Sequence, residues 1–123
     1  MSSATATPLE LALVAGEASG DVLAALLLSG LKQRWGDIHA RGIGGPRMAE
    51  QGFEAWWPSD KLAVRGYVEA LSALPRILRI RRHLIRQCRE APPRLFIGVD
   101  APDFNLGVER RLKAGGIPTV HFV

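Results

Sequence analysis

Asp100 is the side chain in this sequence that is best placed to do chemistry. It directly follows the apolar run 95–99, which is typical of a strand buried on both faces. Partial loss of water at such a strand end would make the carboxylate a stronger base and suit it to proton abstraction. Capping of the next helix is the alternative role, but Asp103, which follows Pro102, stands at the better capping position. We therefore predict that Asp100 is catalytic and that Asp103 is a helix cap.

A second candidate site is the turn from Gly16 to Asp21, which joins an apolar run to an apolar-periodic stretch. A helix that starts near Ser19, with Ser19 as its cap, would point free backbone N–H groups at a bound oxyanion or sugar hydroxyl. A capped tight turn without any ligand explains these residues equally well, because the glycine spacing of dinucleotide sites and the Lys-Ser/Thr of a P-loop are both missing. The substrate-binding candidates in this turn are Glu17, Ser19, Gly20 and Asp21.

A similar turn runs from Gly42 to Met48, where Arg47 could hold a phosphate through two hydrogen bonds. We expect its glycines to be structural, since a sharp strand-to-helix turn requires them with or without a ligand. His121 lies in a later apolar strand and is a further substrate-binding candidate. A buried histidine with a satisfied hydrogen bond is the simpler interpretation of that residue.

The remaining histidines and the cysteine do not suggest a metal site. His39 and His83 lack metal-ligand spacing, and we expect both to be solvated. Cys88 is the single cysteine, so it has no partner for an internal disulfide. No metal and no cofactor are therefore predicted.

The elements that must position these residues alternate between strands and helices. Apolar runs predict strands at about 9–15, 38–43, 53–57, 95–99 and 117–123. Helices are expected from about 19, at 46–52, at 66–90 with a kink or interruption at Pro75, and at 104–114. This order predicts a polar tail, 1–8, and one α/β domain, 9–123, with a Rossmann-like, mainly parallel sheet and helices on both faces. Ligands bind such sheets beyond the carboxyl ends of the strands, where the three candidate regions fall.

Composition and charge narrow the choice of partner. The chain has 123 residues, 47% of them apolar, so it can bury a core, and its net charge of +4 favours an acidic partner. Segment 61–89 carries eight basic residues against one acid, Glu69. The longest apolar stretch, 22–28, is much shorter than the roughly 20 residues that span a bilayer, and the N-terminus lacks a signal-peptide pattern. We therefore expect a cytoplasmic protein.

Apolar and basic side chains occupy different faces of the helix expected at 66–90. The apolar face could pack on the sheet, or its part around Pro75 could enter a lipid interface, and the pattern favours both equally. No nucleic-acid-binding motif accompanies the basic residues, so an anionic membrane is the better candidate partner. The membrane-contact candidates are Val68, Leu71, Leu74, Ile77 and Leu78.

Taken together, the motifs resemble those of the lipid-A-disaccharide synthase family. The resemblance covers residues 9–123 and rests on order and spacing as well as on the motifs themselves. The matching segments are 13–21 (LVAGEASGD), 42–48 (GIGGPRM), 62–64 (LAV), 97–105 (IGVDAPDFN) and 115–121 (GGIPTVH). Arg65 and Ala24 depart from the family pattern, which has methionine and glycine there, but neither is a proposed catalytic residue.

The resemblance implies the N-terminal half of a GT-B glycosyltransferase that uses no metal. Its reaction transfers 2,3-diacylglucosamine from UDP to 2,3-diacylglucosamine 1-phosphate with inversion, which gives lipid A disaccharide 1-phosphate and UDP. The family's essential aspartate, the general base, falls on Asp100. The resemblance also implies a peripheral enzyme on the cytoplasmic face of the inner membrane, which could form a homodimer when complete. The C-terminal domain, which would supply most donor contacts, is expected to be absent, so the chain alone is expected to be inactive.

Two other functions remain open on the sequence. One is a nucleotide-binding Rossmann module, which would need a dinucleotide fingerprint and an acid after the second strand, where Ile43 and Gly44 stand instead. The other is a membrane-docking module without transferase activity, built on the arginine-rich helix.

Overall fold

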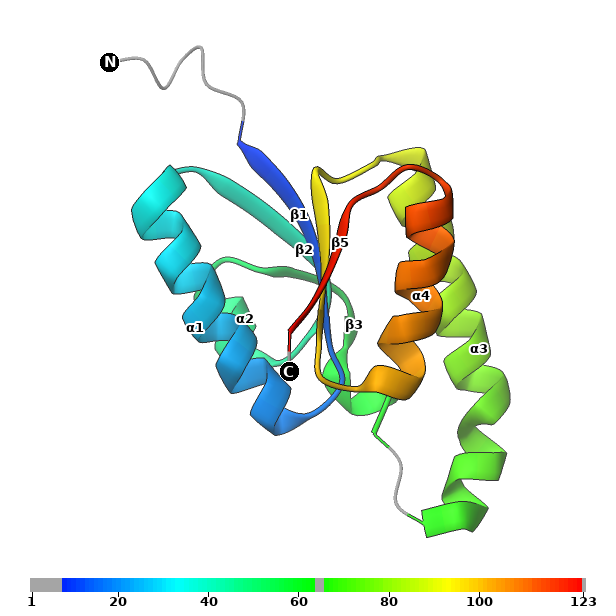
Figure 1. The fold of residues 1–123 in the computed structure, drawn as a ribbon. Coiled ribbons are helices and arrows are strands. Elements are labelled where there is room, and N and C mark those ends of the chain that lie inside the picture. Colours follow the sequence, from blue (N-terminus) through cyan, green and yellow to red (C-terminus); the bar gives the residue numbers. More distant parts are fainter. Residues whose placement is uncertain (1–7, 64–65, 123) are drawn as a thin grey trace.

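The computed structural model describes residues 8–63 and 66–122, which form a five-stranded sheet with helices on both faces (Figure 1). The strands are β1 (Leu9–Ala15), β2 (Ile38–Gly44), β3 (Glu54–Pro58), β4 (Leu95–Val99) and β5 (Thr119–Phe122). The helices are α1 (Ala18–Trp35), α2 (Pro46–Glu50), α3 (Gly66–Glu90) and α4 (Pro102–Ala114), with a short 3-10 helix, η2 (Ser59–Lys61), after β3. Neighbouring strands pair in parallel in the order β3-β2-β1-β4-β5. The predicted α/β, Rossmann-like fold is confirmed.

The central strand β1 is buried on both faces because its alternate side chains enter two different layers. Leu11 and Leu13 pack with α1 and α2, whereas Ala12 and Val14 pack with α3 and α4. Figure 1 shows α1 and α2 on one side of the sheet and α3 and α4 on the other. The carboxyl ends of β1 and β4 therefore lie side by side between the two helical layers.

Two of the predicted helix caps are wrong. The residue before α1 is Glu17 and the residue before α4 is Ala101, and neither helix has a side-chain cap. Ser19 and Asp103 instead lie within the first turns of α1 and α4. The cause at α4 is Pro102, whose fixed φ and missing N–H suit the first helical position, so the helix begins before Asp103.

Of the two effects expected at Pro75, an interruption is wrong, since α3 continues from Gly66 to Glu90 with the proline inside it, and the kink stays a prediction. A proline leaves the carbonyl group four residues earlier without an N–H donor. Pro75 and Leu71 are both exposed, so water can take the place of that donor. The predicted tail, up to residue 7, and Arg65 lie outside the described residues.

The two histidines expected to be solvated are half-buried and hydrogen-bonded. His39 contacts the carboxylates of Glu10 and Glu54 at 2.9 and 3.2 Å. His83 accepts a hydrogen bond from the Trp57 indole, with 3.1 Å between nitrogens. Both interactions join different elements of the fold, which the position of a histidine in a sequence does not reveal.

Candidate active site

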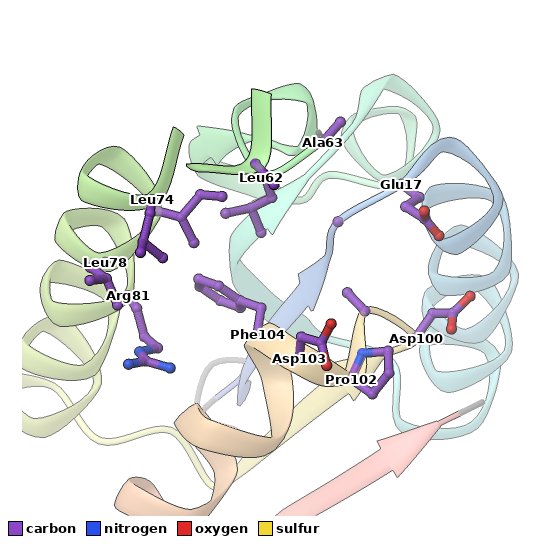
Figure 2. A pocket seen from close by; sticks show the side chains of 14 residues that line it. Glu17, Leu62, Ala63, Leu74, Leu78, Arg81, Asp100, Pro102, Asp103 and Phe104 are labelled. Carbon is purple, nitrogen blue, oxygen red and sulfur yellow. The ribbon is translucent and has the colours of Figure 1, made fainter. Parts of the chain in front are cut away.

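A cavity of about 430 Å³ opens at the carboxyl edge of the sheet (Figure 2). Four segments enclose it: the β1–α1 turn, the loop after η2, residues 70–81 of α3, and the β4–α4 turn. Its lining residues are Gly16, Glu17, Leu62, Ala63, Ala70, Leu74, Ile77, Leu78, Arg81, Asp100, Ala101, Pro102, Asp103 and Phe104. The cavity therefore lies where ligands of such folds bind.

The cavity has an acidic end and an apolar wall. Figure 2 shows Glu17 and Asp100 on one side, the α3 side chains on the opposite side, and Leu62 and Phe104 between them. Asp103 adds a third carboxylate, and Arg81 is the basic side chain among the described lining residues. Such a cavity matches an amphiphile whose hydroxyl groups face the acids and whose hydrocarbon part faces α3.

Asp100 is held in an unusual backbone conformation at this acidic end. Asp100 and Ala101 have φ values of 55° and 43°, in the left-handed region that costs a non-glycine residue about 1–2 kcal/mol. The Asp100 N–H donates to the Phe122 carbonyl at 2.8 Å, so β5 supports the turn. Asp100 is half-buried rather than enclosed, because the chain bends out of the sheet directly after Val99. Asp100 thus lines the cavity, and its catalytic role stays a prediction.

Glu17, in the β1–α1 turn, lines the cavity, whereas Asp21 binds the backbone of the β2–α2 turn. The buried Asp21 carboxylate accepts hydrogen bonds from the backbone N–H groups of Gly45, Arg47 and Met48, at 3.1, 2.9 and 3.0 Å. Asp21 thus caps α2, whose own preceding residue offers no side-chain cap, and it joins α1 to the β2–α2 turn. Ser19 is exposed and Gly20 is buried against the sheet, and neither is among the residues that line the cavity.

The glycines of the second turn are structural, as predicted. Gly42 has a φ of +140°, and a Cβ atom there would overlap the Leu13 carbonyl oxygen. A Cβ on Gly45 would lie 2.6 Å from an Asp21 carboxylate oxygen, so the α2 cap also requires a glycine. The Arg47 side chain is exposed and is not among the residues that line the cavity. Its predicted phosphate contact stays a prediction.

His121 is paired away from the cavity, which agrees with the simpler interpretation of that residue. Its Nδ1 atom lies 2.8 Å from Oε2 of the buried Glu109, so the pair links β5 to α4. A Cβ on Gly98 would overlap the same carboxylate, and a glycine there lets α4 lie close to β4.

The predicted membrane-contact residues divide into two groups. Val68 and Leu71 are 83% and 73% exposed, and Leu74 is also exposed while it borders the cavity. Ile77 and Leu78 are half-buried: Ile77 packs against the core, and both line the cavity. Ile77 therefore packs in part on the core, and the lipid contact predicted for these five residues stays a prediction.

The described ranges 8–63 and 66–122 contain no group of three or more His, Cys, Asp or Glu side chains arranged to hold a metal ion. None of the helices formed by these residues is both long enough and apolar enough to cross a bilayer.

Leu62, Arg81 and Phe104 are among the lining residues that the sequence did not single out as site candidates. Leu62 reaches the cavity because η2 returns the chain to the sheet edge, and no local pattern predicted that short helix. Phe104 stands within the motif 97–105, so its proximity to Asp100 was a signal that could have been used.

Comparison with known proteins supports the motif-based resemblance. The lipid-A-disaccharide synthetase family model matches residues 11–123. Lipid-A-disaccharide synthases from Verminephrobacter eiseniae, Chromobacterium violaceum and Burkholderia thailandensis are 56%, 60% and 61% identical over 100%, 94% and 95% of this chain. The chain spans 32%, 30% and 30% of the lengths of these relatives, in their N-terminal part. A family match over nearly the whole chain, together with identities of this size, shows that the chain belongs to the lipid-A-disaccharide synthetase family.

Proposed function

We propose that this chain supplies the catalytic base and part of the acceptor site of a lipid-A-disaccharide synthase. The reaction is the transfer of 2,3-diacylglucosamine from UDP to a hydroxyl of 2,3-diacylglucosamine 1-phosphate. Asp100 takes the proton of the acceptor hydroxyl as its oxygen attacks the anomeric carbon of the donor sugar. The bond from that carbon to UDP breaks, UDP leaves with the bonding electrons, and attack from the opposite face inverts the anomeric centre.

The observation that carries this proposal is the Asp100 carboxylate at the acidic end of a cavity with an apolar wall. Glu17 and Asp103 lie at the same end, where carboxylate oxygens can accept hydrogen bonds from sugar hydroxyls. Leu74, Leu78 and Phe104 offer the apolar surface that an acyl chain attached to that sugar needs.

The test of the base uses a hybrid protein in which this chain replaces the matching segment of the V. eiseniae synthase. Asp100→Asn keeps the size of the side chain and removes its ability to take a proton. We expect kcat to fall at least about 100-fold, the lower end of what a general base contributes. Asp60→Asn is the matched control, because Asp60 is exposed and is not among the lining residues. A folded Asp100→Asn hybrid with near-normal kcat would refute the assignment.

We also propose that the enzyme is peripheral on the cytoplasmic face of the inner membrane, where its lipid substrates are found. Exposed apolar residues on the first turns of α3 support this proposal: Tyr67, Val68, Leu71 and Leu74. The arginines that follow on the exposed face of α3, Arg79, Arg82, Arg86 and Arg89, suit anionic headgroups. The apolar surface continues into the cavity through Leu74, which would let an acyl chain pass from the bilayer toward Asp100.

A further inference from the structure

Asn105 connects the two strand ends that border the acidic end of the cavity. Its side chain is fully buried in the first turn of α4. The amide nitrogen Nδ2 lies 2.8 Å from the Asp100 carbonyl oxygen, 3.3 Å from that of Val14 and 3.4 Å from that of Val99. The amide must be oriented this way, because the reverse orientation would place its oxygen against three carbonyl oxygens. Asn105 thus donates to the ends of both β1 and β4.

The turn that Asn105 contacts needs such support. Asp100 and Ala101 are two successive non-glycine residues with positive φ, a conformation that persists only where surrounding contacts enforce it. The Asp100 carbonyl, which accepts the shortest of the three Asn105 contacts, belongs to the peptide that joins these two residues. The Asn105 backbone N–H also donates to the Ala101 carbonyl at 2.9 Å. Asn105 therefore holds this turn through both its side chain and its backbone.

The buried amide of Asn105 also has an energetic cost. Asn105 Oδ1 is buried and has no hydrogen-bond partner among the described residues. A buried acceptor without a partner destabilises a fold, and an apolar side chain would avoid this. The presence of asparagine therefore reflects a need for the donor group of the amide at this position.

We propose that Asn105 is a positioning residue for the transfer reaction. Its amide fixes the left-handed turn at Asp100 and so sets the position of the carboxylate at the acidic end of the cavity, on the same side as Glu17. This inference rests on the proposed role of Asp100 as the base. Asn105 itself does not touch the substrate, so it acts on kcat through the geometry of Asp100.

The kinetic test compares three variants of the same hybrid synthase. Asn105→Asp keeps the shape but replaces the donor with an acceptor, and Asn105→Ala removes the amide. Each should lower kcat on the order of 10- to 100-fold, because small misplacement of a catalytic group costs this much. The KM for the acceptor should change much less, because ground-state contacts remain. Val108→Ala, one turn further along α4 and equally buried, is the control that should lower stability and leave kcat unchanged.

A second measurement tests the turn directly in the 123-residue chain. Residues with positive φ bring their own amide and α protons unusually close, which gives a strong cross-peak between them in NMR spectra. Asp100 and Ala101 should show this signal in the parent chain and in Val108→Ala, and lose it in Asn105→Ala. Unchanged cross-peaks in Asn105→Ala, or a normal kcat in the folded Asn105→Ala hybrid, would overturn the inference. An active Asp100→Asn hybrid would instead overturn the proposed base, which the NMR comparison does not depend on.

Discussion

The Asp21 carboxylate shows how a single buried acid can hold the frame of the site. It accepts three backbone N–H groups at the start of α2, a helix of five residues that has no side-chain cap of its own. Since α1 carries Asp21 and follows the cavity-lining residues Gly16 and Glu17, these hydrogen bonds fix α2 and the first turn relative to each other.

We predict that Asp21→Ala lowers the free energy of unfolding by about 2–4 kcal/mol, since it leaves three N–H groups without their charged acceptor. Urea unfolding of the 123-residue chain, followed by circular dichroism, measures the change. Asp60→Ala is the control, because Asp60 is exposed and its removal should cost less than about 0.5 kcal/mol. Equal unfolding midpoints for the two variants would show that Asp21 has no such structural role.

Sequence reasoning identified the residues whose role depends on their immediate neighbours. Asp100 was found because it follows a buried apolar run, and the glycines of the second turn because a sharp turn needs them. The partners of Asp21 and Asn105 could not be found in this way. Asp21 binds a turn that begins 24 positions away, and Asn105 reaches Val14 across 91 positions, so these contacts depend on how separate turns meet at the edge of the sheet. The contact of Asn105 with the Asp100 carbonyl spans only five positions, but it depends on the left-handed turn that no local pattern predicted.

At the scale of elements, His39 joins three strands at the amino-terminal part of the sheet. It lies on β2 and contacts Glu10 of β1 and Glu54 of β3. The hydrogen bond that His39 donates to the Glu54 carboxylate is the main reason that the pKa of His39 is raised. Burial partly opposes this effect, the Glu10 carboxylate adds to it, and the nearby Arg41 charge lowers the pKa slightly. Protonated His39 therefore helps to hold β3 to β2, through Glu54, and β2 to the central strand β1, through Glu10.

This geometry predicts a pH-dependent contribution to stability. The pKa of His39 is higher in the folded state than in the unfolded state. The stability that protonated His39 contributes is therefore complete below the unfolded-state pKa of about 6.5 and is lost as the pH rises through the folded-state pKa. The His39 side chain is 41% exposed, so solvent screening limits the effect to less than about 1 kcal/mol. His39→Gln should destabilise the chain at about pH 5.5 and have little effect at about pH 8.5, measured by urea unfolding. An equal loss at both pH values would contradict this.

The two halves of helix α3 differ in packing, because among the described residues of the first half only Ala73 is buried and Ile77 packs in part on the core. From Ile80 to Cys88 its apolar side chains are buried against the sheet, and Arg82 and Arg86 are exposed, as expected for a surface helix. Its first turns carry Tyr67 and Val68, which are 91% and 83% exposed, and Figure 1 shows this end of α3 projecting beyond α4. The sequence pattern could not separate the two halves, because helical spacing is the same for an apolar face toward a sheet and one toward a bilayer.

We predict that Val68→Ser, Leu71→Ser and Leu74→Ser together weaken binding to vesicles that contain anionic phospholipid. The loss of three apolar side chains from the interface should lower the binding constant at least about tenfold. Flotation of the hybrid synthase with such vesicles measures this, and higher salt should release the parent protein in part. The matched control replaces Val22, Leu26 and Leu106, exposed apolar residues outside α3, with serine. Equal flotation of the two triple variants would exclude α3 as the membrane contact.

At the scale of the whole molecule, the cavity is assembled from segments that the chain brings together only when the sheet is complete. The β1–α1 turn and the β4–α4 turn are more than 80 positions apart in the sequence, yet β1 and β4 pair directly from Leu11 and Leu95 to Ala15 and Val99. Alternation of strands and helices predicted this edge as the ligand site. It did not predict the shape of the cavity, because η2 and the unbroken α3 determine where its apolar wall stands.

This stretch of chain spans 30–32% of the length of its relatives. We propose that the rest of that length supplies most donor contacts, as the resemblance to GT-B enzymes implies. We predict that a polypeptide of these 123 residues forms no disaccharide product from donor and acceptor. Addition of the separately expressed remainder of the V. eiseniae synthase should restore measurable turnover. The covalent hybrid should be more active at low protein concentration, because linkage raises the effective concentration of the two parts.

The assay follows release of UDP and formation of the tetraacyl disaccharide phosphate in detergent micelles. The chain carrying Asp100→Asn, mixed with the same remainder, is the control: it should bind the remainder and restore no turnover. This control separates assembly of the two parts from the chemistry that Asp100 performs. Donor-dependent product from the unsubstituted chain by itself would contradict the prediction. A complete donor site would then have to exist within the cavity that Glu17, Arg81 and Asp100 line.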